Sequence, residues 1–290
     1  MPALLKEVLD FLEVKGGKKY IDATLGGGGH SKAILRCQGE LLAIDRDPEA
    51  IEYASQRLKK ACPTSPFRVV QGNFADLGKI ARENGFEKVE GILFDLGVSS
   101  HQFEEASRGF SFNQEGPLDM RMDPKLSLTA RDLVNVLNEG ELYELFSKLG
   151  EEKYSRRFAR AISEARRVKK IETCAELAQI ILKSAPPRGK LDRRHPATRV
   201  FQALRIAVND EINSLKEALP QAIDLLNFQG RLVILSFHSL EDGVVKRFFL
   251  DEEKAGVLKI ITLKPVEPTK EEVAVNPRAR SAKLRVAEKL

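Results

Sequence analysis

Residues 18–45 read KKYIDATLGGGGHSKAILRCQGELLAID, and this stretch decides the fold class. A short apolar segment at 18–23 leads into the glycine run 26–29, and the pattern predicts a helix of about eight residues from His30. A second apolar segment follows at 40–45. This order predicts the first unit of a parallel α/β sheet, with glycines at a helix N-terminus where a ligand can approach the backbone closely.

The same alternation continues along much of the chain. Further apolar strands are predicted at 67–71, 89–95, 230–236, 258–263 and 282–286, with helices at 4–13, 48–60 and 76–84. Nearly continuous apolar strands that alternate with helices are typical of a parallel sheet covered on both faces. We therefore predict an α/β fold with a mostly parallel, seven-stranded, Rossmann-like sheet, whose last two strands form an antiparallel pair at one edge.

A long interruption separates the fourth strand from the fifth. No buried strand is predicted between 103 and 199, and the helical candidates there are 142–146, 156–166 and 174–182. A long helix at 200–226, bent or split at Pro220, leads back to the sheet. We predict two domains: residues 1–102 with 200–290 carry the sheet, and residues 103–199 form a helical insert.

Positive charge is concentrated in this insert. Between Lys153 and Arg199 there are 14 Lys or Arg residues against four acidic residues, although the whole chain carries only +5. So few acids cannot pair with all these bases, and a block of this kind favours a polyanionic partner. Charge alone does not separate RNA from DNA or from an acidic protein.

Composition excludes several other classes of protein. Hydrophobic residues make up 42% of the chain and charged residues 31%, as in a folded globular protein. The apolar runs are too short to span a bilayer, and Lys6, Glu7 and Asp10 would disrupt a signal-peptide core, so a cytoplasmic location is expected. The three cysteines form no C-x-x-C pair, so neither a disulfide framework nor a thiolate zinc site is predicted, and no metal is expected.

The residues around the glycine run indicate an adenosine-containing cofactor. Asp45 lies 19 residues after Gly26, at a strand end where a carboxylate accepts hydrogen bonds from ribose hydroxyls. A dinucleotide fingerprint would place Gly or Ala where Ser31 stands, and Asp22 would repel a pyrophosphate. S-adenosylmethionine carries an amine and a sulfonium but no phosphate, so we favour it over NAD. A tight turn with a solvated Asp45 is the alternative without a ligand.

Two more strand ends are candidates for the same site. Phe74 follows the third strand and could pack against adenine, although an ordinary core position is equally compatible with its pattern. Asp95 ends the fourth strand and could hold the cofactor's amine, because the carboxyl ends of parallel strands face one crevice.

Six motifs in one order resemble the RsmH (MraW) methyltransferase family over nearly the whole chain. They are DLGVSS at 95–100, RGFSF at 108–112, LDMRMD at 118–123, FQALRIAVN at 201–209, SFHSLED at 236–242 and NPRARS at 276–281. The resemblance implies a class I S-adenosylmethionine-dependent methyltransferase with a helical, substrate-binding insert after the fourth strand. It also implies N4-methylation of a cytidine in the decoding region of 16S ribosomal RNA.

The family's cofactor contacts fall on residues that this chain retains. The resemblance implies cofactor binding by Gly28, Gly29, His30, Asp45, Phe74, Asp95 and Gln102. No metal is implied, and no catalytic proton acceptor is identified. Asp119 and His238 are hypotheses for contacts with the target base, and a structural hydrogen bond is the alternative reading for each.

The chain also departs from the family pattern at two points. Members usually have a His-x-Pro-Val stretch before the first helix, whereas this chain starts Met1-Pro2-Ala3 and lacks that histidine. Gly243 stands where the family usually has an arginine, which removes one cation near the expected crevice.

Other functions remain compatible with the residues alone. They include a non-catalytic RNA-binding assembly factor on a methyltransferase fold, an NAD-dependent oxidoreductase, and a methyltransferase for DNA or protein. The expected partner is ribosomal RNA or the small ribosomal subunit, not a membrane, and a homodimer is also compatible with the sequence.

Overall fold

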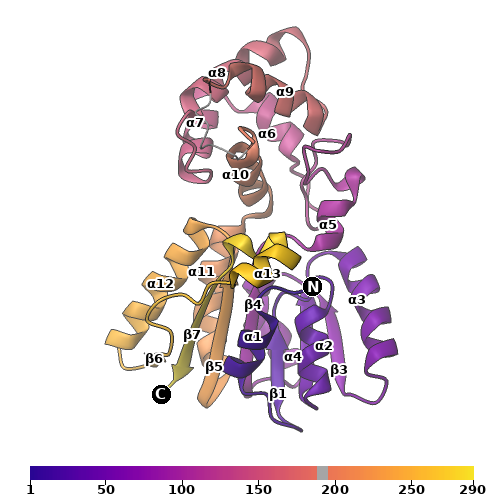
Figure 1. The fold of residues 1–290 in the computed structure, drawn as a ribbon, viewed down its shortest axis with the longest axis vertical. Coiled ribbons are helices and arrows are strands. Elements are labelled where there is room, and N and C mark those ends of the chain that lie inside the picture. The colour runs from indigo at the N-terminus through magenta and orange to yellow at the C-terminus, as the bar shows by residue number, and fades with distance from the viewer. Residues whose placement is uncertain (188–194) are drawn as a thin grey trace. The chain divides into compact units, whose positions relative to one another are not determined.

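The computed structural model describes residues 1–187 and 195–290. Four of the predicted basic residues, Arg188, Lys190, Arg193 and Arg194, lie outside the described residues. The chain divides into two compact units (Figure 1). Met1–Ser99 and Ile212–Leu290 form one, here called the sheet unit, and Ser100–Glu211 form the other, here called the helical unit.

The sheet unit is built on one sheet, which has seven strands within the described residues, in the order β3-β2-β1-β4-β5-β7-β6. The strands are β1 (Lys19–Asp22), β2 (Glu40–Asp45), β3 (Phe67–Gln71), β4 (Val89–Asp95), β5 (Leu226–Ser236), β6 (Leu258–Ile260) and β7 (Lys283–Lys289). The first five pair in parallel, while β7 is antiparallel to both β5 and β6. This confirms the predicted mostly parallel sheet and its antiparallel edge pair.

Helices cover both faces of this sheet, as the apolar strands predict. One face packs against α1 (Leu5–Leu12), α2 (Gly29–Arg36) and α3 (Pro48–Ala61), and the other against α4 (Leu77–Glu83), α11 (Glu211–Leu225) and α12 (Ser239–Lys254). Successive strand residues point to opposite faces, so Tyr20 joins the first core and Ile21 the second. The short α13 (Lys270–Val275) and η3 (Pro277–Ser281) precede β7.

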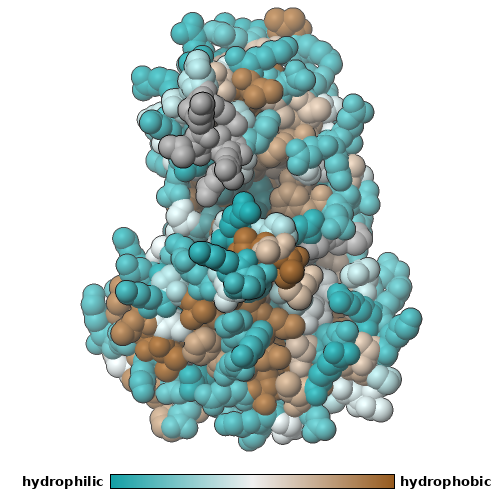
Figure 2. Space-filling model, viewed as in Figure 1, coloured by the Kyte–Doolittle hydropathy of each residue, from teal (hydrophilic) through white to brown (hydrophobic). Residues whose placement is uncertain are grey.

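The helical unit consists of helices, three of which have starts encoded in the local sequence. They are α5 (Ser100–Glu104), η2 (Ala106–Arg108), α6 (Ala130–Val136), α7 (Glu139–Lys148), α8 (Ser155–Val168), α9 (Cys174–Ser184) and α10 (Thr198–Asn209). Thr129, Asn138 and Thr173 begin α6, α7 and α9 with capping boxes, in which the side chain at N3 bonds back to the cap residue. Figure 2 shows hydrophilic side chains over much of the visible surface of both units.

The boundary between the units differs from the expected one. Residues 200–211 belong to the helical unit, not to the sheet domain, because α10 packs against α6 and α7. The predicted long helix breaks at Asp210, whose φ of 48° lies in the left-handed region, and not at Pro220, which lies inside α11. At the end of α10, Asn209 also accepts from the Met122 amide at 2.8 Å and donates to the Met120 carbonyl at 2.8 Å. These bonds fix α10 to the loop 118–123.

None of the described helices is both long and apolar enough to cross a membrane.

Candidate functional site

The carboxyl ends of β1, β2 and β4 meet at one edge of the sheet, and hydrogen bonds tie them together. The Gly26 amide, just after β1, donates to Asp45 Oδ2 at the end of β2 over 2.7 Å. The Asp95 amide, at the end of β4, donates to Thr24 Oγ1 over 2.6 Å. The glycine turn and the two predicted carboxylates therefore form one cluster in the sheet unit.

Asp45 is half-buried, and backbone amides hold both of its oxygens. Besides the bond from Gly26, its Oδ1 accepts from the Asp47 amide at 3.0 Å. Burial raises the pKa of Asp45 to about 6, against the opposing effect of these two hydrogen bonds. Because a carboxylate oxygen has two lone pairs, each oxygen can accept one more hydrogen bond from a ligand hydroxyl.

The structure differs from the expectation that the Asp22 carboxylate faces a cationic ligand. It is buried, its Oδ2 accepts from the Ser31 hydroxyl at 2.6 Å, and its Oδ1 accepts from the Thr24 amide at 3.2 Å. Burial raises the pKa of Asp22, and the Ser31 hydrogen bond opposes this rise. Ser31, which stands where a dinucleotide fingerprint has Gly or Ala, is thus the hydrogen-bond partner of Asp22. The bond between these two buried side chains stabilises the turn.

His30 is buried at the start of α2 and contacts Asp95. Its Nδ1 lies 3.2 Å from Asp95 Oδ2, and its Nε2 lies 3.0 Å from the Ala3 carbonyl oxygen. Burial alone would lower the pKa of His30, but the hydrogen bond and charge of Asp95 outweigh it and raise the pKa. The Asp95 side chain is 27% exposed, so it remains accessible to a ligand while His30 orients it.

Phe74 begins η1 (Phe74–Asp76), and Gly72 and Asn73 separate it from the end of β3. Its ring is half-buried and packs edge-to-face against Phe94, with the ring centroids 5.7 Å apart. The Arg46 guanidinium lies 5.4 Å from the Phe74 centroid and donates to Asn73 Oδ1 at 3.0 Å. Arg46 was not predicted as part of this site, although it directly follows Asp45 in the sequence and so shares its place at the strand end.

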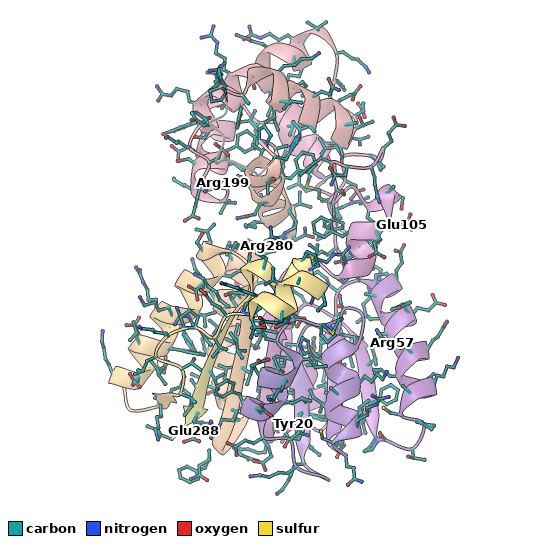
Figure 3. All side chains as sticks on the ribbon, viewed as in Figure 1. Tyr20, Arg57, Glu105, Arg199, Arg280 and Glu288 are labelled. Carbon is teal, nitrogen blue, oxygen red and sulfur yellow. The ribbon has the colours of Figure 1, made fainter. Side chains whose placement is uncertain are left out.

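The glycine turn is shaped by contacts that the sequence did not reveal. Gly28 has a φ of 70°, and a Cβ there would lie 3.2 Å from the Cβ of Ala54, so both backbone conformation and packing require glycine. Arg57, on α3 (labelled in Figure 3), donates to the Gly27 carbonyl oxygen at 2.9 Å and fixes the outer side of the turn.

Six of the seven predicted cofactor residues lie in the sheet unit. The seventh, Gln102, belongs to α5 of the helical unit and has a buried side chain.

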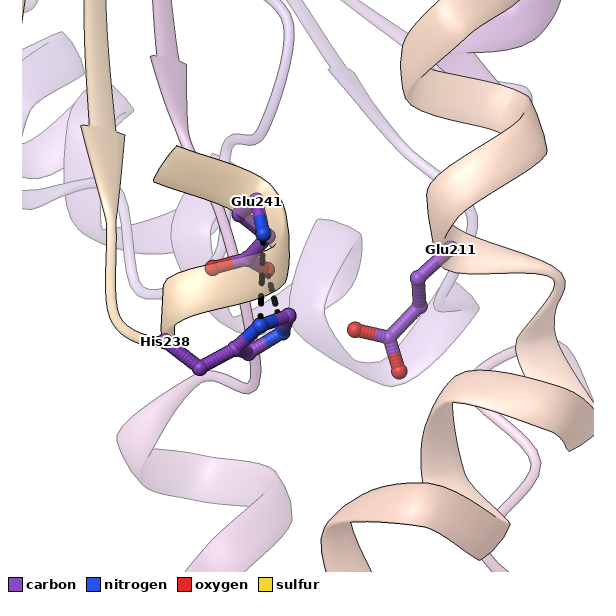
Figure 4. Close-up of side chains that lie close together, drawn as sticks. All are labelled: Glu211, His238 and Glu241. Atoms are coloured by element: carbon purple, nitrogen blue, oxygen red, sulfur yellow. Dashed lines mark hydrogen bonds and ion pairs between the residues drawn. The ribbon is translucent and has the colours of Figure 1, made fainter. Parts of the chain in front are cut away.

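His238 and Asp119, the two hypothetical base contacts, both have structural partners. His238 is the N-cap of α12, its Nδ1 faces the Glu241 amide at 3.4 Å, and its Nε2 lies 3.1 Å from Glu241 Oε1 (Figure 4). Asp119 accepts from Arg121 Nε at 2.8 Å and Nη2 at 2.7 Å, and these bonds lower the pKa of Asp119 despite its partial burial. Both groups therefore stabilise local backbone structure, whatever else they contact.

Helix α8 carries the densest described part of the basic segment. Three of its arginines have partners. The Arg156 guanidinium lies 5.2 Å from the centroid of the Tyr143 ring, Arg160 forms an ion pair with Glu164 at 2.8 Å, and Arg166 donates to the Val134 carbonyl at 2.6 Å. Arg157 and Arg167 are exposed and form no ion pair with the described residues. These two are the best placed of the five to contact phosphate.

The basic residues of β7 are less available than their sequence suggests. Arg285 is buried and donates to Asp242 Oδ1 at 2.6 Å, and Lys283 lies 3.3 Å from the other oxygen of Asp242. Both thus pair with Asp242 of the SFHSLED motif, whereas Arg280 of η3 is exposed (Figure 3).

Comparison with known proteins gives a consistent result. The model of the family described as "MraW methylase family" matches residues 1–290. Three relatives, each named "Ribosomal RNA small subunit methyltransferase H", match all of this chain and 97–98% of their own length. They come from Heliobacterium mobile, Carboxydothermus hydrogenoformans and Geobacter sulfurreducens, and are 44%, 45% and 48% identical to this chain.

Proposed function

The chain belongs to the MraW methylase family, and from this premise we propose that it methylates N4 of a cytidine in the decoding region of small-subunit ribosomal RNA. It is a methyltransferase, and its methyl donor is S-adenosylmethionine. The observation that carries the substrate class is the full-length identity of 44–48% to relatives named as methyltransferases of small-subunit ribosomal RNA. The base and the atom rest on the motif resemblance described under Sequence analysis.

The residues at the sheet edge fit this cofactor. Asp45 offers carboxylate oxygens, already oriented by two backbone amides, to the ribose hydroxyls. Asp95, oriented by His30, offers a partly exposed carboxylate to the amine, and Phe74 offers a half-buried ring to the adenine. When bound, S-adenosylmethionine supplies a methyl group on a positively charged sulfur. The glycine turn lets the backbone approach it closely.

The chemistry requires positioning more than strong acid or base catalysis. The N4 lone pair of cytosine is delocalised into the ring, so the protein must align the amine with the methyl carbon and its leaving group. A proton must also leave N4 during or after attack. His238 and Asp119 each already bond within their own loop or helix turn, and we assign neither as the acceptor of that proton.

The exposed cations of α8 are compatible with a polyanionic substrate such as RNA. We propose that they hold phosphates of the RNA, while the target base leaves its stack to reach the methyl donor. A small-subunit RNA substrate places the protein in the cytoplasm.

The test is methyl transfer from isotopically labelled S-adenosylmethionine to small ribosomal subunits isolated from cells that lack this activity. Digested RNA is then analysed by mass spectrometry, and we expect label in N4-methylcytidine at one position of the decoding region. The Asp95→Ala variant is the matched negative control. Label in another nucleoside would contradict the proposed atom, and label only in DNA or protein would contradict the substrate. Binding of NAD with no transfer to any substrate would favour the oxidoreductase.

A further inference from the structure

The first four residues lie directly against the glycine turn. The Ala3 carbonyl oxygen is 3.0 Å from His30 Nε2, and Ala3 and Leu4 are buried. A Cβ on Gly29 would lie 3.0 Å from Cγ of Pro2, so the glycine at this position makes room for the N-terminal segment. Residues 1–4, here called the N-terminal segment, therefore pack against the turn.

Two residues at α13, far along the sequence, hold this segment in place. Glu272 Oε1 of α13 accepts from the Leu4 amide at 2.8 Å, and Asn276 Nδ2 donates to the Met1 carbonyl at 3.1 Å. Leu4 is the N-cap of α1 and has no side-chain cap of its own, so the Glu272 carboxylate takes the place of a cap. Thr269 in turn caps α13 by accepting from the Glu272 amide at 3.2 Å.

His30 connects this arrangement to Asp95. Both of its ring nitrogens face acceptors, the Ala3 carbonyl and the Asp95 carboxylate, so the ring donates twice only as an imidazolium. The charged groups that act on the ring are Asp95 from β4 and Asp22 from β1. The raised pKa of His30 agrees with this geometry.

We propose that Glu272 and Asn276 are positioning residues for the methyl-donor site. They fix the N-terminal segment, whose Ala3 carbonyl fixes the His30 ring, which in turn orients the Asp95 carboxylate. This inference rests on the proposed role of Asp95 in binding the cofactor's amine. Glu272 lies 268 residues from its partner Leu4, so two segments far apart in the sequence jointly determine the geometry of one carboxylate.

The first test measures S-adenosylmethionine affinity of the full-length protein by calorimetry. We expect Glu272→Ala to weaken binding about three- to ten-fold, less than the loss of a direct hydrogen bond to a charged group would cause, because Glu272 acts on Asp95 only through the N-terminal segment and His30. Glu267→Ala removes an exposed carboxylate from the same C-terminal segment and should leave the affinity unchanged. Asn276→Ala removes only the bond to Met1 and should give a smaller loss in the same direction. Thermal melts identify any variant that fails to fold, and Asn276→Ala then serves as the test variant.

A double-mutant cycle distinguishes the positioning role of Glu272 from the proposed cofactor role of Asp95 on which it rests. If Glu272 acts through Asp95, adding Glu272→Ala to Asp95→Asn should cause no further loss of affinity. Full additivity of the two changes would overturn the positioning role while leaving the cofactor role of Asp95 intact. An Asp95→Asn variant that binds as tightly as wild type would instead overturn the proposed cofactor role.

The pKa of His30, measured by NMR titration, is a readout that general destabilisation of the fold would not change. In the folded Glu272→Ala variant the Ala3 carbonyl is no longer held, so the pKa of His30 should fall below its wild-type value, while Asp95 continues to raise it. The same pKa in wild type and in the folded variant would contradict the proposed connection.

Discussion

Replacement of Asp45 by asparagine tests the central assignment of the site through its pH dependence. Burial raises the pKa of Asp45 to about 6, so lowering the pH through this value protonates it. A protonated carboxyl is a weaker acceptor for ribose hydroxyls than a carboxylate, so cofactor affinity should be highest above pH 7 and fall toward pH 5. Cofactor affinity should therefore rise with pH, as expected when a carboxyl group must be ionised to bind the ligand.

The size of the effect follows from the pKa. At pH 8 about 99% of Asp45 is ionised, and at pH 5 about 10%, so affinity should fall about ten-fold between these values if only the ionised form binds well. Asp45→Asn has no titrating group, so its affinity should be weak at both pH values and should not show this fall.

The assay is calorimetric titration with S-adenosylmethionine in steps from pH 5 to pH 8. Comparing variants at the same pH cancels any titration of the ligand itself. Asp10→Asn, at an exposed position on α1, is the matched control and should keep the wild-type profile. A flat wild-type profile, or an Asp45→Asn variant that keeps the wild-type fall, would refute the ribose assignment.

Three further predictions concern the rest of the molecule. Asp95→Ala should abolish methyl transfer while circular dichroism shows an intact fold, and wild-type turnover would exclude a role for Asp95 in binding the methyl donor. Replacing Arg157 and Arg167 with Ser should reduce the slope of log RNA affinity against log salt by about 1.5 in filter binding, without changing cofactor affinity. An unchanged slope would mean that RNA binds to another part of the protein. Asp242→Ala leaves the buried Arg285 without its 2.6 Å partner and should lower the free energy of unfolding by about 3 kcal/mol in urea titrations. A loss well below 1 kcal/mol would mean that water replaces the partner.

Local pattern was sufficient to predict the layout of the sheet. Runs of apolar residues such as 40–45 are buried on both faces only in a covered parallel sheet, and glycine at 26–29 is needed where a strand turns sharply into a helix. The places of Asp45 and Asp95 at strand ends follow from these short segments. Their roles toward the cofactor remain predictions.

The partners of the site residues depended on the tertiary structure. His30 contacts Ala3, and Leu4 bonds to Glu272, because the folded chain brings residues 1–4 and the segment around α13 together at the glycine turn, and no local pattern records such a path. The end of the insert was misplaced for a similar reason. Pro220 is the stronger local break signal, but the helix ends at Asp210, whose φ is 48°, just after Asn209 bonds to the loop 118–123.

The sequence by itself thus determined the fold class, the location of the glycine turn and the residue types available for chemistry. These depend on periodicity and on backbone preference within about ten residues. Only the tertiary structure decided which of those groups are already bonded. Asp22 is held by Ser31 and Asp119 by Arg121, and Nδ1 of His238 accepts from the Glu241 amide, whereas Asp95 stays partly exposed. A polar side chain is available to a ligand only when the folded chain has not satisfied all of its hydrogen bonds, and the folded backbone settles that balance even between residues that are close in sequence.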